Sequence, residues 1–401
     1  MDLLITGQLL VPGTNGVLEL RPGTLTIRRG VIESVSDRIH ARPDFGGPEF
    51  LITPGFVDAH VHLPQFDSIG VDGMELLEWL RRAVFPAEVR WADAQYASVM
   101  AQRVATDLLS FGTTSIAAYA TVHPESAQAA IEACAGAGLS GHVGQVLMDR
   151  NAPPELCMGV REAAGAASRL RGVGRVMPAV TPRFAVSCTA EMLAEAGKLA
   201  KATGWYVQTH LSETRAEIDA VEGLFPGQSY LEVYARAGLL GPRTIFAHGV
   251  WLDNDDLARI AKAGGIVAHC PTANRFLRAG EMDRERTLRS GALMALGSDV
   301  AGGPDRSMVR VARAMIETQN SLGHPARAGS AAWSQITRWN AALLGLERVG
   351  ELRAGSVADV LVVKPSTRWM ESVNPLSHLL YAWDDRWLRA TITGGEVRWQ
   401  S

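Results

Sequence analysis

Two histidines one residue apart, His60 and His62, are placed to bind one metal ion. They lie in Phe56–His62, where apolar and polar residues alternate with the period of a β-strand. Side chains two residues apart share one face of a strand, so both imidazoles point the same way. Imidazole nitrogens bind zinc at about 2 Å. A lone His-x-His is more often a polar patch on a sheet, so the other ligands must come from elsewhere in the chain.

The elements that position these histidines follow a repeating pattern of strand, loop and helix between Pro54 and about Gly350. With the His-x-His strand, eight stretches read as strands: the others are Gly112–Ala118, Gly141–Met148, Val176–Thr181, Tyr206–His210, Thr244–Gly249, Gly265–Cys270 and Leu293–Asp299. Helical patterns between them include Ala92–Ser110, Ala190–Thr203 and Asp255–Ala263, the last with an N-cap at Asp253 and a stop at Gly264-Gly265. Alternating units of this kind predict a (β/α)8 TIM-type barrel over residues 56–353.

Both ends of the chain are rich in short strand-like stretches. Residues 1–55 contain Leu3–Thr6, Thr24–Arg28 and Val31–Val35, with turns expected at Pro12-Gly13, Pro22-Gly23 and Arg29-Gly30. Residues 354–401 contain Asp359–Lys364, Ala390–Thr393 and Glu396–Trp399. We expect the two ends to pair into one small β-sandwich domain beside the barrel.

Further candidate ligands follow the later strands of the expected barrel. His210 ends the fifth strand, His248 the sixth and Asp299 the eighth, and Glu213 comes three residues after His210. Barrel enzymes carry their chemistry at the C-terminal ends of their strands. Each residue alone could be structural, but together with the His-x-His pair they indicate a metal site with a carboxylate beside it.

The composition limits the classes of binding partner and the cellular compartment that we expect. The chain has 401 residues, 47% of them hydrophobic, and a net charge of −3, which argues against nucleic acid or a membrane surface as the main partner. No apolar run is long enough to span a membrane, and Asp2 stands where a signal peptide would be basic. The four cysteines are scattered without Cys-x-x-Cys spacing. We therefore expect a cytoplasmic protein with reduced thiols.

The run Pro54–His62, the histidines that end strands five and six, and Asp299 resemble the amidohydrolase superfamily. Other segments narrow the resemblance to its guanine deaminase family: Gln65, Leu77–Leu80 with Phe85–Glu88, Thr121–Glu125, Met148–Asn151, Thr181–Phe184, His210–Glu213, Ala247–Gly249, His269–Pro271 and Ser298–Gly303. The resemblance covers essentially the whole chain. It implies a homodimer that deaminates guanine hydrolytically to xanthine and ammonia.

The resemblance also implies which residues act. The zinc ligands fall on His60, His62, His210 and Asp299. The substrate contacts fall on His62, Leu63, Pro64, Gln65, Arg183, Phe184, His210, Leu211, Ser212, Glu213 and Asp299. Glu213, Asp299 and His248 are the expected catalytic residues, with Glu213 giving a proton to a ring nitrogen of the substrate.

The number of metal ions follows from a missing residue. Amidohydrolases with two metals usually bridge them through a carboxylated lysine at the end of strand four. This chain has no lysine before Lys198, and its strand four ends in Thr181–Phe184. An arginine cannot form such a bridge, so we expect one Zn²⁺ per subunit.

Two departures from the family pattern leave alternatives open. The run Thr272–Gly280 contains an unusual Arg275 and Arg278, and Thr337–Gly345 lacks a usual pair of glycines. The arginines could favour a larger or more acidic ring, so an aminohydrolase acting on 8-oxoguanine, a pterin or a triazine is the alternative. A non-catalytic scaffold of the same fold is a third hypothesis, although every expected ligand is present.

Overall fold

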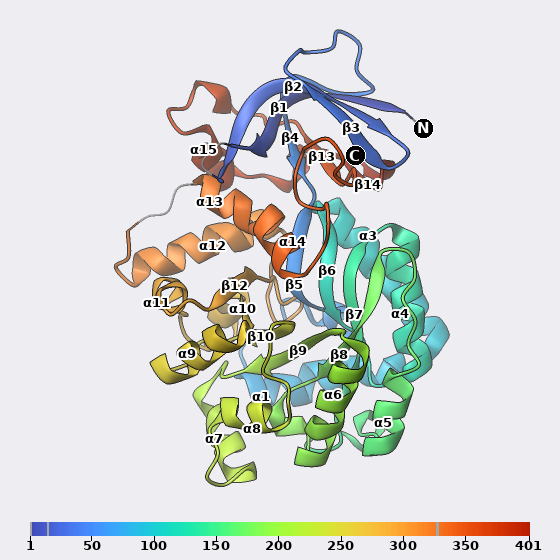
Figure 1. Cartoon of the computed structure of the whole chain (residues 1–401), viewed down its shortest axis with the longest axis vertical. Coiled ribbons are helices and arrows are strands. Elements are labelled where there is room, and N and C mark those ends of the chain that lie inside the picture. The colour runs from blue at the N-terminus through green and yellow to red at the C-terminus, as the bar shows by residue number, and fades with distance from the viewer. Residues whose placement is uncertain (1, 14–15, 326–328) are drawn as a thin grey trace.

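The computed structural model describes residues 2–13, 16–325 and 329–401 of the chain, and it has two parts (Figure 1). An eight-stranded parallel sheet with helices around it forms a barrel, and a seven-stranded mixed sheet built from both chain ends lies at one end of it. The barrel expected from the sequence is therefore confirmed. The small domain is confirmed as well, as one sheet to which both termini contribute.

The barrel strands run in chain order around the sheet, each parallel to the next. They are β5 (Phe56–His62), β6 (Thr113–Tyr119), β7 (Ser140–Leu147), β8 (Val176–Pro182), β9 (Tyr206–Leu211), β10 (Thr244–His248), β11 (Ile266–His269) and β12 (Leu293–Leu296). All eight strand stretches expected from the sequence are present, with ends that differ by a few residues at most.

Helices cover the outside of the barrel and one of its mouths. They are α1 (Leu76–Trp79), the π-helical turn η2 (Leu80–Val84), α2 (Phe85–Val89), α3 (Ala94–Ser110), α4 (Pro124–Ala137), α5 (Val160–Ala167), α6 (Ala190–Thr203), α7 (Arg215–Leu224), α8 (Tyr230–Arg236), α9 (Asn254–Ala263), α10 (Pro271–Phe276), α11 (Arg284–Arg289), α12 (Met308–Ser321), α13 (Gly329–Ser334), the π-helical turn η6 (Gln335–Trp339), α14 (Asn340–Leu343) and α15 (Pro375–Ala382). The expected cap of α9 is confirmed, because the Asp253 side chain accepts a hydrogen bond from the Asp256 amide and Gly264 ends the helix at φ +72°.

The sheet of the chain ends has the order β15-β14-β13-β4-β1-β2-β3. Its strands are β1 (Leu3–Pro12), β2 (Leu18–Arg28), β3 (Val31–Ser36), β4 (Phe45–Pro54), β13 (Val360–Val363), β14 (Leu388–Thr393) and β15 (Glu396–Gln400). The two chain ends meet where β13 pairs antiparallel with β4, which leads directly into β5.

One expected turn in this sheet is wrong. Pro22-Gly23 lies inside β2 and pairs with Gly7 and Gln8 of β1. The other neighbour of β2, β3, pairs only from Thr24 onward. The side of β2 next to Pro22 is therefore an open edge, where a residue without an N–H is tolerated.

The barrel closes at a seam between its first and last strands. The Asp299 amide donates to the His60 carbonyl at 2.9 Å, and the His62 amide donates to the Val300 carbonyl at 2.8 Å. Asn340 of α14 joins the same two strands: its Nδ2 donates to the carbonyls of Val57 and Leu296, and its Oδ1 accepts from the Leu296 amide. The side chain of Asn340 thus replaces ladder bonds that the seam lacks.

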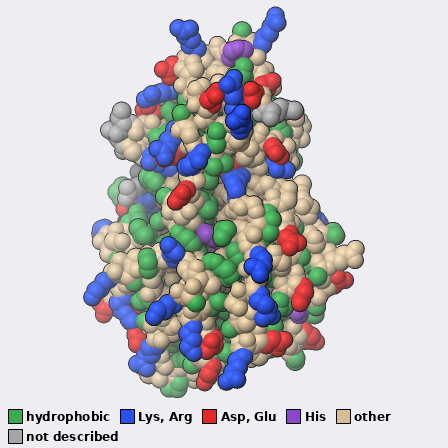
Figure 2. Space-filling model, turned by 45° about the vertical axis from the view of Figure 1, so that its right-hand side comes forward, with side chains coloured by type: hydrophobic (Ala, Val, Ile, Leu, Met, Phe, Trp, Pro, Cys, Tyr) green, Lys and Arg blue, Asp and Glu red, His purple; other side chains and the backbone are tan. Residues whose placement is uncertain are grey.

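The outer surface of the molecule has no dominant sign of charge on the face drawn in Figure 2, where basic and acidic side chains are interspersed. Within the described part of the chain, no helix is both long and apolar enough to cross a membrane.

The seam generates a prediction about stability. Asn340→Ala should lower the free energy of unfolding by about 2–4 kcal/mol, because it leaves buried backbone groups of Val57 and Leu296 without partners. Urea denaturation followed by circular dichroism measures the change. Asn320→Ala, at an exposed position of α12, is the control and should shift it by less than about 0.5 kcal/mol. Equal effects of the two variants would contradict the role of Asn340.

Candidate active site

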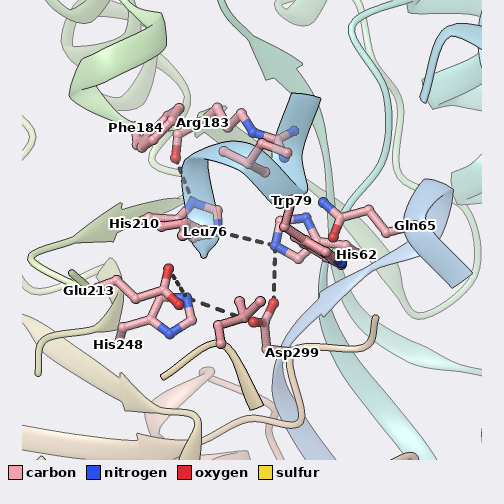
Figure 3. A pocket seen from close by; sticks show the side chains of 12 residues that line it. His62, Gln65, Leu76, Trp79, Arg183, Phe184, His210, Glu213, His248 and Asp299 are labelled. Carbon is pink, nitrogen blue, oxygen red and sulfur yellow. Dashed lines mark hydrogen bonds and ion pairs between the residues drawn. The ribbon is translucent and has the colours of Figure 1, made fainter. Parts of the chain in front are cut away.

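Four candidate ligands converge at the C-terminal end of the barrel, and Figure 3 shows three of them, His62, His210 and Asp299. The Nε2 atom of His62 lies 3.2 Å from Nε2 of His60 and 3.1 Å from Nε2 of His210, and Asp299 Oδ1 lies 3.2 Å from His60 Nε2. Ligand atoms about 2.05 Å from a common point at tetrahedral angles lie about 3.3 Å apart. The spacing of these four atoms therefore fits one metal ion.

Protonation states agree with that fit. Burial lowers the pKa of His60 to about 3 and the pKa values of His62 and His210 well below the ordinary value of histidine. The rings are neutral as a result, and each has one nitrogen lone pair. His210 Nδ1 donates to the Arg183 carbonyl at 2.7 Å, which leaves Nε2 as its lone-pair nitrogen facing the other ligands. Such second hydrogen bonds are usual for histidines that bind metals.

His248 and Glu213 lie beside the ligands. Nε2 of His248 is 3.4 Å from Glu213 Oε2 and 3.9 Å from Asp299 Oδ2. The amide Nδ2 of Asn274 lies 2.9 Å from His248 Nδ1. With the amide in this orientation, Nδ1 accepts, and the proton of the neutral ring is on Nε2, between the two carboxylates. One carboxylate oxygen of Asp299 therefore faces the candidate ligands, and its other oxygen faces His248.

The position of Glu213 is fixed by contacts with Glu217 of the following helix, α7. The Glu217 carboxylate accepts from the Glu213 amide at 2.9 Å and from the Tyr230 hydroxyl at 2.5 Å, and it completes a capping box with Thr214. Burial, followed by the neighbouring Asp299 and Glu217 carboxylates, raises the pKa of Glu213 well above its usual value. Its Oε1 is buried without a partner in the described structure. Glu213 is therefore suited to hold a proton.

The backbone is strained at three points around these side chains. Ser212, His248 and Asp299 have φ values of +50°, +72° and +52°, in the left-handed region that residues other than glycine seldom adopt. Each of them follows or ends a barrel strand. Strain of this kind clusters at functional sites, where surrounding contacts impose it.

A cavity with about 360 Å³ of empty space, part of it open to solvent, borders this group. Of the residues proposed from the sequence, its walls contain His62, Gln65, Arg183, Phe184, His210, Glu213, His248 and Asp299. His60 lies behind them as a candidate ligand. Leu63, Pro64, Leu211 and Ser212 are buried in the segments that carry these residues and do not line the cavity.

Sequence reasoning missed the apolar roof of the cavity. Leu76, Trp79 and Leu80, from α1 and the start of η2, line it, as does Leu277 after α10. The signal was present, because the Leu77–Leu80 segment was among those that carried the family resemblance. Its position over the cavity is a tertiary property that the segment itself does not reveal.

A buried carboxylate, Glu88 of α2, was also missed. Arg183 Nη1 donates to both of its oxygens, at 2.6 and 2.8 Å, and Gln65 Nε2 donates to Oε1 at 3.1 Å. Glu88 is 3% exposed. The two polar side chains at this edge of the cavity are therefore both tied to it.

The two unusual arginines lie outside the cavity. Arg275 pairs with Glu317 at 3.3 Å and donates to the Thr318 hydroxyl at 2.9 Å, so it joins α10 to α12. Arg278 lines a separate hollow next to the cavity. Neither side chain is placed to select a larger or more acidic ring within the cavity itself.

Comparison with known proteins places this geometry in a family. The model of the amidohydrolase family matches residues 51–398. The chain belongs to the amidohydrolase family. Like other metal-dependent amidohydrolases, it has a histidine-rich group able to hold a metal ion, formed by His60, His62 and His210 and, around His60, by His248 and Asp299.

This amidohydrolase has similar relatives in several organisms. It is 31% identical to guanine deaminase of Escherichia coli (strain K12), with 94% of this chain and 91% of the relative covered. It is 37% identical to a probable guanine deaminase of Deinococcus radiodurans, with 79% and 74% covered. A solved structure of guanine deaminase from C. acetobutylicum with guanine bound in its active site matches 99% of this chain and 100% of its own, with a TM-score of 0.91 and 28% identity.

Proposed function

We propose that the chain hydrolyses guanine to xanthine and ammonia. The observation that carries the proposal is one cavity whose wall holds both the candidate metal ligands His62, His210 and Asp299 and the polar pair Gln65 and Arg183. Its relatives from E. coli and D. radiodurans bear the name guanine deaminase or probable guanine deaminase, and the C. acetobutylicum enzyme binds guanine in its active site.

We propose further that the metal is a single zinc ion, held by His60, His62, His210 and Asp299. Three imidazoles and one carboxylate are zinc ligands, and zinc held by them would take a water as a fifth ligand and lower its pKa to about 7. The end of β8, where two-metal relatives carry a bridging lysine, reads Thr181-Pro-Arg-Phe184. The Arg183 side chain is occupied by Glu88 there, which supports one ion rather than two.

The proton transfers of the reaction are carried out by different residues of the site. Asp299 accepts the proton of the attacking water, and His248 orients that water through Nε2. Glu213 holds a proton because of its raised pKa and donates it to a ring nitrogen of guanine, which makes C2 electrophilic. When C2 has become tetrahedral, its amino group takes up the proton held by Asp299 and leaves as ammonia, while the C2 hydroxyl returns a proton to Glu213 and becomes the carbonyl of xanthine.

We propose that the cavity edge favours guanine over adenine. Arg183 has only donors, and the O6 atom of guanine is an acceptor. Adenine carries an amino donor at that position. A buried donor that faces another donor is left unpaired, which costs free energy and lowers turnover of the wrong ring. Phe184 supplies a flat apolar face in the same wall.

The assembly and location of the enzyme belong to the same proposal. We propose a cytoplasmic homodimer whose barrel domain spans residues 56–353 and whose small domain spans residues 1–55 and 354–401. Two-fold dimers are the commonest closed assemblies, and four free cysteines, three of them buried, are typical of a reducing compartment.

The metal proposal predicts about one zinc per chain. Metal analysis of protein purified without chelator should give a ratio near one, and His60→Ala should give a ratio near zero because it removes a central ligand. His40→Ala, at an exposed position, is the control and should keep its zinc. A reproducible ratio near two in the parent would contradict the single-metal site.

The proton-transfer scheme predicts the effect of Glu213→Gln. Turnover should fall by about 10²–10⁴, the loss typical of a missing general acid or base, while zinc content stays the same. Steady-state ammonia release and metal analysis measure the two quantities. The matched control is Glu222→Gln at an exposed position of α7, which should retain parental turnover. Full activity of the Glu213 variant would place the proton transfer elsewhere.

A substrate panel tests the function itself. We expect kcat/KM for guanine to exceed that for 8-oxoguanine, adenine and pterin, with adenine a poor substrate or none. Ammonia release from each ring is the measurement. A better kcat/KM for another member of the panel would assign the enzyme to that heterocycle. No ammonia from any ring, together with no bound metal, would leave the scaffold hypothesis.

A further inference from the structure

Glu88 is the one described acidic residue in contact with both Gln65 and Arg183. It comes from α2, whereas Gln65 follows β5 and Arg183 follows β8. All three side chains are buried, with 2–3% of each residue exposed. The ion pair between Glu88 and Arg183 is therefore shielded from water, and its geometry is held by the surrounding packing.

The Glu88 carboxylate decides which way the amide of Gln65 points. An ionised carboxylate only accepts hydrogen bonds, so the Gln65 NH₂ group must face it, as the 3.1 Å contact shows. The Gln65 carbonyl oxygen is then directed away from Glu88, and it has no partner among the described residues, while the side chain lines the cavity. Gln65 therefore presents its carbonyl acceptor to a ligand, and one of its two N–H groups is held by Glu88.

The same carboxylate limits what Arg183 offers. Nη1 is engaged by both oxygens of Glu88, so the other guanidinium nitrogens are the donors left for a ligand. The guanidinium also lies over the ring of Phe85, 5.6 Å from its centre, and Phe85 belongs to the same helix as Glu88. Helix α2 thus fixes the guanidinium both by charge and by an aromatic face.

We propose that Glu88 is a positioning residue that sets the order of hydrogen-bonding groups along the cavity edge, with an acceptor at Gln65 and donors at Arg183. A ligand that fits this edge carries a ring N–H next to an acceptor. Guanine has this pair as N1–H and O6, whereas 2-aminopurine has the same amino group at C2 but neither the N1–H nor O6. The inference rests on the proposed function and adds the residue that makes the cavity selective.

The test compares kcat/KM for guanine with kcat/KM for 2-aminopurine. In Glu88→Gln the charge is lost and the Gln65 amide is free to turn, so the ratio of the two constants should fall by about 10- to 100-fold. Zinc content should match the parent. A purely structural defect would lower both constants in proportion and leave the ratio unchanged, so an unchanged ratio in the folded, zinc-loaded variant overturns the proposal.

Further variants separate the contributions. Gln65→Met removes the acceptor but keeps the Glu88–Arg183 pair, so it should also lower the ratio. In the Gln65→Met background, the additional change Glu88→Gln should lower the ratio by a smaller factor than Glu88→Gln does in the parent. Glu371→Gln, which removes an exposed carboxylate paired with Arg368, is the control and should keep the parental ratio. An unchanged ratio in Gln65→Met overturns the acceptor role.

Folding and function are controlled separately. If Glu88→Gln yields no folded protein, the variant Glu88→Asp is used instead. The shorter side chain keeps the negative charge but places it one methylene group farther from Gln65, so we expect the same fall in the ratio. Guanine turnover by the parent tests the proposed function alone. If the parent does not deaminate guanine, the proposed function fails. The role of Glu88 is then decided by calorimetry, which measures the ratio of the dissociation constants for guanine and 2-aminopurine.

Discussion

The candidate site depends on the seam where the barrel closes. The amide of Asp299 is bonded to the carbonyl of His60, and the amide of His62 is bonded to the carbonyl of Val300. The last candidate ligand is therefore brought to the first two by the same hydrogen bonds that join the end strands. Closing the barrel and assembling the ligand set are one event, so the metal-binding geometry exists only in the complete fold.

Charge balance explains how so many ionisable groups are buried in one place. Burial keeps the three candidate ligand histidines neutral, Arg183 is neutralised by Glu88, and a raised pKa favours the protonated form of Glu213. Asp299 is the carboxylate left facing the histidine nitrogens. A divalent cation bound there would offset its charge and give the converging lone pairs a common partner.

Local patterns were enough for most of the fold but not for the whole site. Helix α6 has the predicted bounds, and the two-residue period of β5 placed both histidines on one face, because these features depend on neighbours in the chain. The role of Glu88 could not be predicted in this way, since its partner Arg183 lies 95 residues away. No periodicity indicates which of 42 acidic residues turns inward. Strand β4 was missed because its first half, Phe45–Glu49, contains two glycines and a proline, which are uncommon inside strands.

The segment from Leu76 to Val89 contributes to the cavity in two ways. Its first half covers the cavity with Leu76, Trp79 and Leu80, and its second half carries Glu88. Because the two halves form a continuous run of helical turns, a displacement of the first half would also move Glu88 away from Arg183 and Gln65. Access to the cavity and the proposed selectivity of its edge therefore depend on one and the same segment of the chain.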